Sequence, residues 1–156
     1  MRARGFTLIE LVITLAIIGL LTTAALPLAQ LVAKREKETE LRTALRDIRN
    51  SIDAYKLAAQ TGHIKQEVDA SGYPPDLKSL YAGIEDQSNP QNVNLYFIRR
   101  IPRDPFYPDG SVAAEDTWGL RSYKSPPDDP QPGDDVYDVY SLSTGVGLNG
   151  VHYRDW

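Results

Sequence analysis

The sequence predicts an α+β protein in which one long N-terminal helix packs on a small antiparallel β-sheet domain. Three observations predict it: an apolar run over residues 6–33, a one-face apolar stripe after that run, and short β-favouring runs separated by Pro and Gly near the C-terminus. We therefore divide the chain into a short leading segment (1–5), an apolar helix (6–33), an amphipathic helix (34–61) and a globular domain (62–156).

The apolar run is long enough to cross a bilayer, because a spanning helix needs about 20 residues. A cleaved secretory signal has an apolar core of roughly 7–15 residues, so the run is predicted to be a retained membrane helix. Arg2 and Arg4 favour a cytoplasmic N-terminus, although three basic residues after the run weaken that argument. Glu10 is the only ionisable residue within the run. It is either a tolerated interfacial acid or a group whose positive partner lies elsewhere.

The amphipathic segment carries apolar residues at spacings of 4, 3, 4, 3 and 4, namely Leu41, Leu45, Ile48, Ile52, Tyr55 and Ala59. This stripe lasts less than four heptads, which favours a packing face for the C-terminal domain over a two-stranded coiled coil. Since nothing breaks the pattern after Ala33, the two helical segments are expected to form one helix from Phe6 to Thr61. Such a helix is about 84 Å long.

The globular domain, residues 62–156, is predicted to be a set of short elements. Pro74 and Pro75 lead into a short helix over residues 77–84, and prolines end a helix-like or extended stretch over 98–106. Strands are expected at 118–123, 136–142 and 151–153. A long exposed hairpin loop, 125–135, connects the first two strands.

Composition excludes several classes of function. The net charge of −4 argues against a nucleic-acid partner, and the lack of Cys with only two His argues against a thiolate or histidine metal cluster. His63 and His152 have no obvious catalytic partner. The stretch from Gly145 to Gly150 fits a dinucleotide-binding pattern but lacks a following helix, so a Gly-rich turn is predicted. The acidic residues Asp128, Asp129, Asp134 and Asp135 are predicted to belong to a solvated loop. We therefore expect no enzymatic activity.

The stretch from Arg4 to Leu11, RGFTLIEL, resembles the class III signal of type IV prepilins and type II secretion pseudopilins. The resemblance makes residues 1–5 a leader peptide and implies that a prepilin peptidase cleaves between Gly5 and Phe6 and methylates the new N-terminus of Phe6. It also implies that Glu10 pairs with the N-terminal amine of a neighbouring subunit. Gly19 and Pro27 match the family pattern too, and we expect residues 20–26 to loosen on assembly.

The C-terminal half resembles the major, G-type pseudopilin of type II secretion and implies a pilin-like fold. The matching pieces, in order, are Tyr73-Pro74 with Leu77, Ile101-Pro102-Arg103-Asp104-Pro105-Phe106, Trp118-Gly119, Tyr137-Asp138-Val139-Tyr140-Ser141-Leu142 and Asp155-Trp156. In that family several Asp residues in the last loop commonly bind a structural calcium ion. This chain departs from that pattern, so no cofactor is predicted. Asn149 and Asp155 are the side chains left as calcium ligands.

The resemblance implies a structural subunit of the type II secretion pseudopilus, a helical homo-oligomeric filament that supports protein export across the outer membrane. The implied partners are the prepilin peptidase, minor pseudopilins, an inner-membrane platform protein, an assembly ATPase and an outer-membrane secretin. The subunit is expected to cross the bacterial inner membrane once, with a periplasmic domain, before it joins a periplasmic filament. The alternatives are a major or minor type IV pilin for adhesion, motility or DNA uptake and a membrane-tethered periplasmic binding domain.

Overall fold

The computed structural model describes residues 5–91 and 93–156, which form two compact units divided between Lys37 and Glu38. One helix, α1, runs from Leu8 to Gln60 and belongs to both units. Its bounds confirm the predicted single helix to within two residues at either end. Gly62, with a φ of 80°, follows α1 and provides the left-handed residue that commonly ends a helix.

The N-terminal unit consists of the first part of α1 and the short segment that precedes it. By length and composition this part of α1 can cross a membrane, and none of its apolar window is buried within the chain. Large apolar side chains are exposed along its length, from Phe6 to Val32. Pro27 lies inside the helix, where its missing N–H removes one backbone hydrogen bond.

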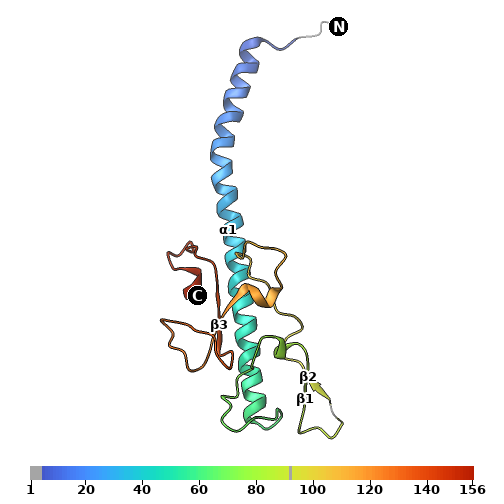
Figure 1. The fold of residues 1–156 in the computed structure, drawn as a ribbon. Helices are drawn as coiled ribbons and strands as arrows, with labels where there is room; N and C mark the ends of the chain where they lie inside the picture. The colour runs from blue at the N-terminus through green and yellow to red at the C-terminus, as the bar shows by residue number, and fades with distance from the viewer. Residues whose placement is uncertain (1–4, 92) are drawn as a thin grey trace. The chain divides into compact units, whose positions relative to one another are not determined.

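The C-terminal unit is built on the second part of α1, around which the remaining segments gather (Figure 1). All six residues of the predicted stripe are buried. They pack in one cluster with residues from the rest of the unit, among them Leu77, Leu80, Ile101, Trp118, Val136, Val139 and Tyr153. The stripe is therefore the packing face for the C-terminal domain, as the sequence predicted.

Two antiparallel two-stranded sheets accompany α1. β3 (Trp118–Arg121) pairs with β4 (Asp138–Ser141), and β1 (Ile84–Glu85) pairs with β2 (Asn94–Leu95). The first pair confirms two of the predicted strands and the loop that connects them. The second pair was not predicted, because two-residue strands are too short to show an alternating pattern.

Two other predictions need correction. The third strand, 151–153, is wrong: His152 forms one isolated bridge with Val146, and a 3-10 helix, η3, follows at Tyr153–Asp155. The short helix predicted at 77–84 is limited to the 3-10 turn η1, Lys78–Leu80, after which the chain enters β1. A third 3-10 helix, η2 (Ala114–Thr117), leads directly into β3. The regular elements that follow α1 are thus only two to four residues long, and irregular segments connect them.

The Trp118-Gly119 pair has a steric explanation. Gly119 is opposite Tyr140 in the sheet, and a Cβ at Gly119 would lie 2.3 Å from the Tyr140 ring. Glycine therefore makes room for the aromatic ring that crosses the strand. The Trp118 indole is buried on the other face of the strand and donates its N–H to the Pro102 carbonyl at 2.8 Å.

Asp104 is the polar centre of the segment before β3. It is 1% exposed and accepts hydrogen bonds from the Ser141 hydroxyl at 2.6 Å and the Phe106 N–H at 2.8 Å. Its own N–H donates to Thr117 Oγ1 at 3.1 Å. Asp104 thus joins the irregular 98–106 stretch to β4 and to the residue before β3. Its carboxylate is buried together with hydrogen-bond donors, as buried polar groups in proteins generally are.

Candidate processing and assembly site

Thr7 and Glu10 close the first turn of α1 with a reciprocal pair of hydrogen bonds. The Glu10 N–H donates to Thr7 Oγ1 at 3.3 Å, and the Thr7 N–H donates to Glu10 Oε2 at 3.5 Å. This is a capping box, in which an N-cap threonine and the acid three residues later satisfy each other's backbone N–H groups. The Thr-Leu-Ile-Glu sequence therefore starts the helix, a local role that the sequence analysis missed although the spacing signals it.

Glu10 keeps capacity for a further partner. Its side chain is exposed, and its bond to Thr7 is at the long limit of hydrogen-bond distances. An ionised carboxylate offers about four acceptor positions, so an ammonium group can bind while the cap persists or can displace it. No ion pair to Glu10 is found in residues 5–91 and 93–156. The carboxylate can thus receive a positive group from another chain.

Gly5 and Phe6 precede α1 in an exposed segment without regular structure, and residues 1–4 of the predicted leader lie outside the described residues. Phe6 is 83% exposed. A Cβ at Gly5 would meet no atom within 4 Å, so the fold of this chain does not itself require glycine there. The peptide bond between the two residues is accessible to an enzyme. If glycine is required at position 5, the requirement is set by a protein that binds this segment and not by the fold of the chain.

Gly19 and Pro27 lie inside α1, and the backbone between them is helical in this single chain. Thr22 and Thr23 donate their hydroxyls to the carbonyls of Ile18 and Gly19 at 2.8 and 2.9 Å. Such back-bonding, like the missing Pro N–H, weakens the helical ladder locally. A Cβ at Gly19 would meet open space, so no contact in the chain fixes that glycine. The loosening of residues 20–26 on assembly stays a prediction.

The last loop offers few ligands for a calcium ion. Asn149 Oδ1 already accepts the Val151 N–H at 3.1 Å. Asp155 lines a cavity of about 510 Å³ together with Arg42, Arg46 and Arg49, whose positive charges oppose a cation. No group of three His, Cys, Asp or Glu that could hold a metal occurs in the described part of the chain. The donor set therefore does not fit an ion that takes 6–8 oxygens.

Glu38 and Arg49 contact the last loop, and the sequence analysis did not single them out. Glu38 is 5% exposed and accepts hydrogen bonds from Leu148 and Tyr153, while Arg49 donates to the Val139 and Trp156 carbonyls. A signal for Glu38 was present, because it lies three residues before Leu41 and extends the apolar stripe by one turn. A charged residue on a buried face indicates a polar partner.

His63 has partners that are distant in sequence. Its Nδ1 lies 3.0 Å from Asp86 Oδ1 and 2.8 Å from Ser88 Oγ, which also donates to Asp86 at 2.6 Å. Hydrogen bonds from Ser88, followed by that from His63, lower the pKa of the Asp86 carboxyl. In a Ser-His-Asp catalytic set the serine and the acid bind opposite ring nitrogens. Here both approach Nδ1, so the group joins the end of α1 to the β1–β2 connection.

The acidic loop is only partly as predicted. Asp128, Asp129 and Asp134 are exposed, whereas Asp135 is buried. Burial raises the pKa of Asp135, but hydrogen bonds from Ser71, Ser122 and the Tyr123 N–H outweigh burial and lower it. Asp135 is therefore a structural anchor of the loop between β3 and β4, and its prediction as a solvated residue was wrong.

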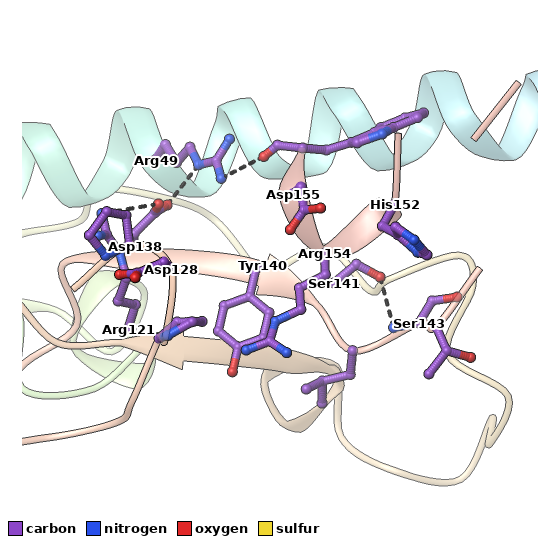
Figure 2. Close-up of a pocket in the computed structure, with 15 residues that line it drawn as sticks. Arg49, Arg121, Asp128, Asp138, Tyr140, Ser141, Ser143, His152, Arg154 and Asp155 are labelled. Carbon is purple, nitrogen blue, oxygen red and sulfur yellow. Dashed lines mark hydrogen bonds and ion pairs between the residues drawn. The ribbon is translucent and has the colours of Figure 1, made fainter. Parts of the chain in front are cut away.

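A cavity of about 720 Å³ lies beside the same loop and η3 (Figure 2). Three arginines and three aspartates line it: Arg49, Arg121, Arg154, Asp128, Asp138 and Asp155. Arg49 Nε binds Asp138 Oδ1 at 2.7 Å, and Arg121 lies 3.6 Å from the other oxygen. The arginine and aspartate side chains that line this cavity are thus equal in number, and two of the arginines lie next to the same aspartate.

The Gly145–Gly150 stretch is a turn, as predicted. Val146 and His152 form an antiparallel bridge around it, and the Gly147 N–H donates to the Val151 carbonyl at 2.8 Å. A Cβ at Gly147 would lie 2.4 Å from the Trp156 ring, and Gly150 has a φ of 80°. These glycines serve a close approach and a left-handed conformation, and η3 follows them instead of the longer helix of a nucleotide site.

Comparison with known proteins places these features in one family. The N-terminal residues 1–26 match the prokaryotic N-terminal methylation motif. The chain is 31% identical to type II secretion system core protein G of Pectobacterium carotovorum subsp. carotovorum over 144 residues, covering 86% of this chain and 83% of the relative. It is 30% identical to the protein of that name in Klebsiella michiganensis over 139 residues, covering 85% and 88%.

A third relative extends the similarity over almost the full length. Type II secretion system core protein G of Dickeya chrysanthemi is 27% identical over 157 aligned residues, covering 96% of this chain and 94% of the relative. No solved structure matches the chain. At 96% coverage, this alignment includes residues from both the methylation motif and the C-terminal unit. The chain belongs to the family of type II secretion system core protein G.

Proposed function

We propose that this chain is a structural subunit of a type II secretion pseudopilus, a filament that supports protein export across the outer membrane. The observation that carries the proposal is the combination of a prepilin methylation motif with an exposed apolar helix and similarity to core protein G along most of the chain. The chain acts by assembly and has no reaction of its own. Its relatives share the name of a secretion-system component, and the alignments with three of them cover 83%, 88% and 94% of the relative.

Processing is the first proposed step. A prepilin peptidase cleaves the peptide between Gly5 and Phe6 and methylates the new amine of Phe6. The exposure of this segment and the open space around Gly5 support cleavage here, because the enzyme can approach the backbone without displacing any part of the chain. Cleavage leaves a positive amine on Phe6, two residues before α1 begins at Leu8.

Assembly is the second step, and Glu10 is its central residue. In a lone subunit the carboxylate caps its own helix through a long hydrogen bond to Thr7. In the filament it pairs with the Phe6 amine of a neighbour, which gives it a charge-assisted bond in an apolar surrounding. Gly19 and Pro27 permit residues 20–26 to loosen as the helices pack.

The C-terminal unit forms the filament surface, and the apolar part of α1 anchors the subunit in the inner membrane before assembly. The proposed N-terminus is cytoplasmic and the C-terminal unit periplasmic. An assembly ATPase and a platform protein extract the subunit, minor pseudopilins join the filament, and the secretin provides the exit. Exposure of the large apolar side chains between Phe6 and Val32 supports a helix that moves from lipid to a helical bundle.

A complementation assay tests this function. The chain is expressed in a bacterium whose type II secretion core protein G gene has been deleted, and export of a secreted reporter enzyme is measured. Restored export, abolished by Glu10→Ala and retained by Thr14→Ala, supports the proposal. Thr14 is a matched control because its hydroxyl is satisfied by the Leu11 carbonyl at 2.8 Å within the same helix. Restored pilus motility in a type IV pilin deletion, without reporter export, would contradict it.

A further inference from the structure

The last loop of the chain, residues 143–156, is fastened to α1 by the buried side chain of Glu38. Glu38 Oε1 accepts the Leu148 N–H at 2.8 Å and the Tyr153 hydroxyl at 3.0 Å. Only 5% of Glu38 is exposed. One carboxylate oxygen thus organises two points of the loop that are five residues apart.

Tyr153, one of the two donors to this carboxylate, is buried among aromatic rings. It is 2% exposed, stacks on Phe106 with ring centroids 4.1 Å apart, and meets the Trp156 ring edge-on at 5.0 Å. Burial, followed by the Glu38 hydrogen bond and charge, raises the pKa of Tyr153 to about 12. Its hydroxyl therefore remains a donor at any physiological pH.

The far end of the loop has a second attachment to α1. Arg49 Nη2 donates to the Trp156 carbonyl at 2.9 Å, and the Arg42 guanidinium lies 4.3 Å from the centroid of the Trp156 ring. Arg42 and Arg49 lie one and three turns beyond Glu38 on the same helix. Three charged side chains of α1 thus hold the loop, one acidic and two basic.

Several of the loop's own oxygens accept hydrogen bonds from within the loop. The Gly145 carbonyl accepts the Tyr153 N–H at 3.1 Å, and the Gly147 carbonyl accepts the Gly150 N–H at 3.0 Å. Ser143 Oγ accepts the Gly145 N–H at 3.3 Å. The loop thus directs N–H and O–H donors toward a protein carboxylate, the reverse of a loop that directs oxygens toward a cation.

We propose that Glu38 is the positioning residue of this loop and takes the organising role that a calcium ion has in related pseudopilins, so that the loop folds without a divalent cation. The charge at the centre of the loop is reversed. The buried Glu38 carboxylate accepts hydrogen bonds from N–H and O–H donors, whereas a calcium ion would be coordinated by oxygen atoms. This inference concerns the folding of the C-terminal unit and does not depend on filament assembly.

Hydrogen exchange of the full chain in detergent micelles tests the proposal, with the Leu148 amide as the local readout. In the wild-type chain, exchange of this amide is expected to be the same with saturating CaCl2 and with excess EGTA. Glu38→Ala is expected to speed it on the order of tenfold, the factor for loss of a hydrogen bond to a charged acceptor. Glu40→Ala, an exposed acid on the same helix, is the matched control and is expected to leave it unchanged.

Two further variants separate local positioning from general destabilisation. Glu38→Gln keeps an acceptor oxygen and is expected to restore most of the protection, while Tyr153→Phe keeps the ring stacking and removes one donor, leaving Leu148 protected. The CaCl2 and EGTA comparison needs no variant and stands even where Glu38→Ala does not fold. Slower exchange in CaCl2 than in EGTA, or equal effects of Glu38→Ala and Glu40→Ala, would overturn the proposal.

Discussion

Glu10 and Thr7 bind each other across the first turn of α1, each side chain accepting the other's backbone N–H, at 3.5 and 3.3 Å. The same carboxylate is the proposed partner for the amine of a neighbouring subunit. The two roles are compatible because the capping bond is long and the side chain exposed. Thr7 therefore holds Glu10 near the helix start, where the neighbour's amine has to reach it.

Thr7→Val is expected to weaken the start of α1 by about 1 kcal/mol, because the N-cap acceptor is lost while the side-chain shape is kept. The measurement is amide exchange of residues 8–10 in detergent micelles, which should become faster. Thr7→Ser retains the hydroxyl and should behave as the wild type. Equal exchange in all three chains would show that the cap does not form.

Asp104→Ala is expected to lower the free energy of unfolding of the C-terminal unit by roughly 2–4 kcal/mol, since Ser141 and Phe106 each lose a buried acceptor. Urea unfolding followed by tryptophan fluorescence measures it through the buried Trp118. Asp128→Ala, at an exposed position, should change stability by less than about 0.5 kcal/mol. A loss no larger than this control would refute the anchoring role of Asp104.

Gly119→Ala is expected to destabilise the β3–β4 pair by about 1–3 kcal/mol, because the added Cβ collides with the Tyr140 ring. Gly110→Ala is the control, since a Cβ there meets no atom within 4 Å. The double variant Gly119→Ala with Tyr140→Ala should show coupling, because removal of the ring relieves the collision. Strictly additive effects in thermal unfolding would argue against this contact.

Because of Tyr153, the free energy of unfolding of the C-terminal unit is expected to decrease as the pH rises in the alkaline range. Its folded pKa is raised from 10.0 to about 12, so its contribution is complete below pH 10 and is lost as the pH rises from 10 towards 12. The pKa values of Tyr55, Tyr73 and Tyr81 are also raised, so absorbance titration of tyrosinate should show several late-titrating groups in the wild type, of which Tyr153→Phe removes the one near pH 12. Persistence of that late group in the variant would assign it to another tyrosine.

Much of the fold follows from sequence periodicity. The stripe from Leu41 to Ala59 predicts both the length of the second part of α1 and the face that it buries, because helical spacing is a local property. β3 and β4 follow from β-favouring residues between turn signals. The two-residue strands β1 and β2 do not, since their pairing depends on how the chain packs after η1.

The polar contacts were harder to predict than the apolar ones. His63, Asp86 and Ser88 come together only because the β1–β2 connection returns to the end of α1, a long-range feature that no local spacing reveals. Glu38 is different, because its position on the apolar stripe signals a buried acid. Thr7 and Glu10 also have the spacing of a capping box, so both local functions were readable in the sequence.

Filament formation by the Glu10→Ala variant tests the central claim most directly. The full chain is produced with a prepilin peptidase and a type II assembly apparatus, filaments are sheared from the cells and imaged by electron microscopy, and mass spectrometry reads the N-terminus. We predict that wild type and Thr14→Ala begin with methylated Phe6 and form filaments, and that Glu10→Ala is cleaved after Gly5 but forms none. Normal filaments from a cleaved Glu10→Ala chain would contradict the pairing of Glu10 with a neighbouring Phe6.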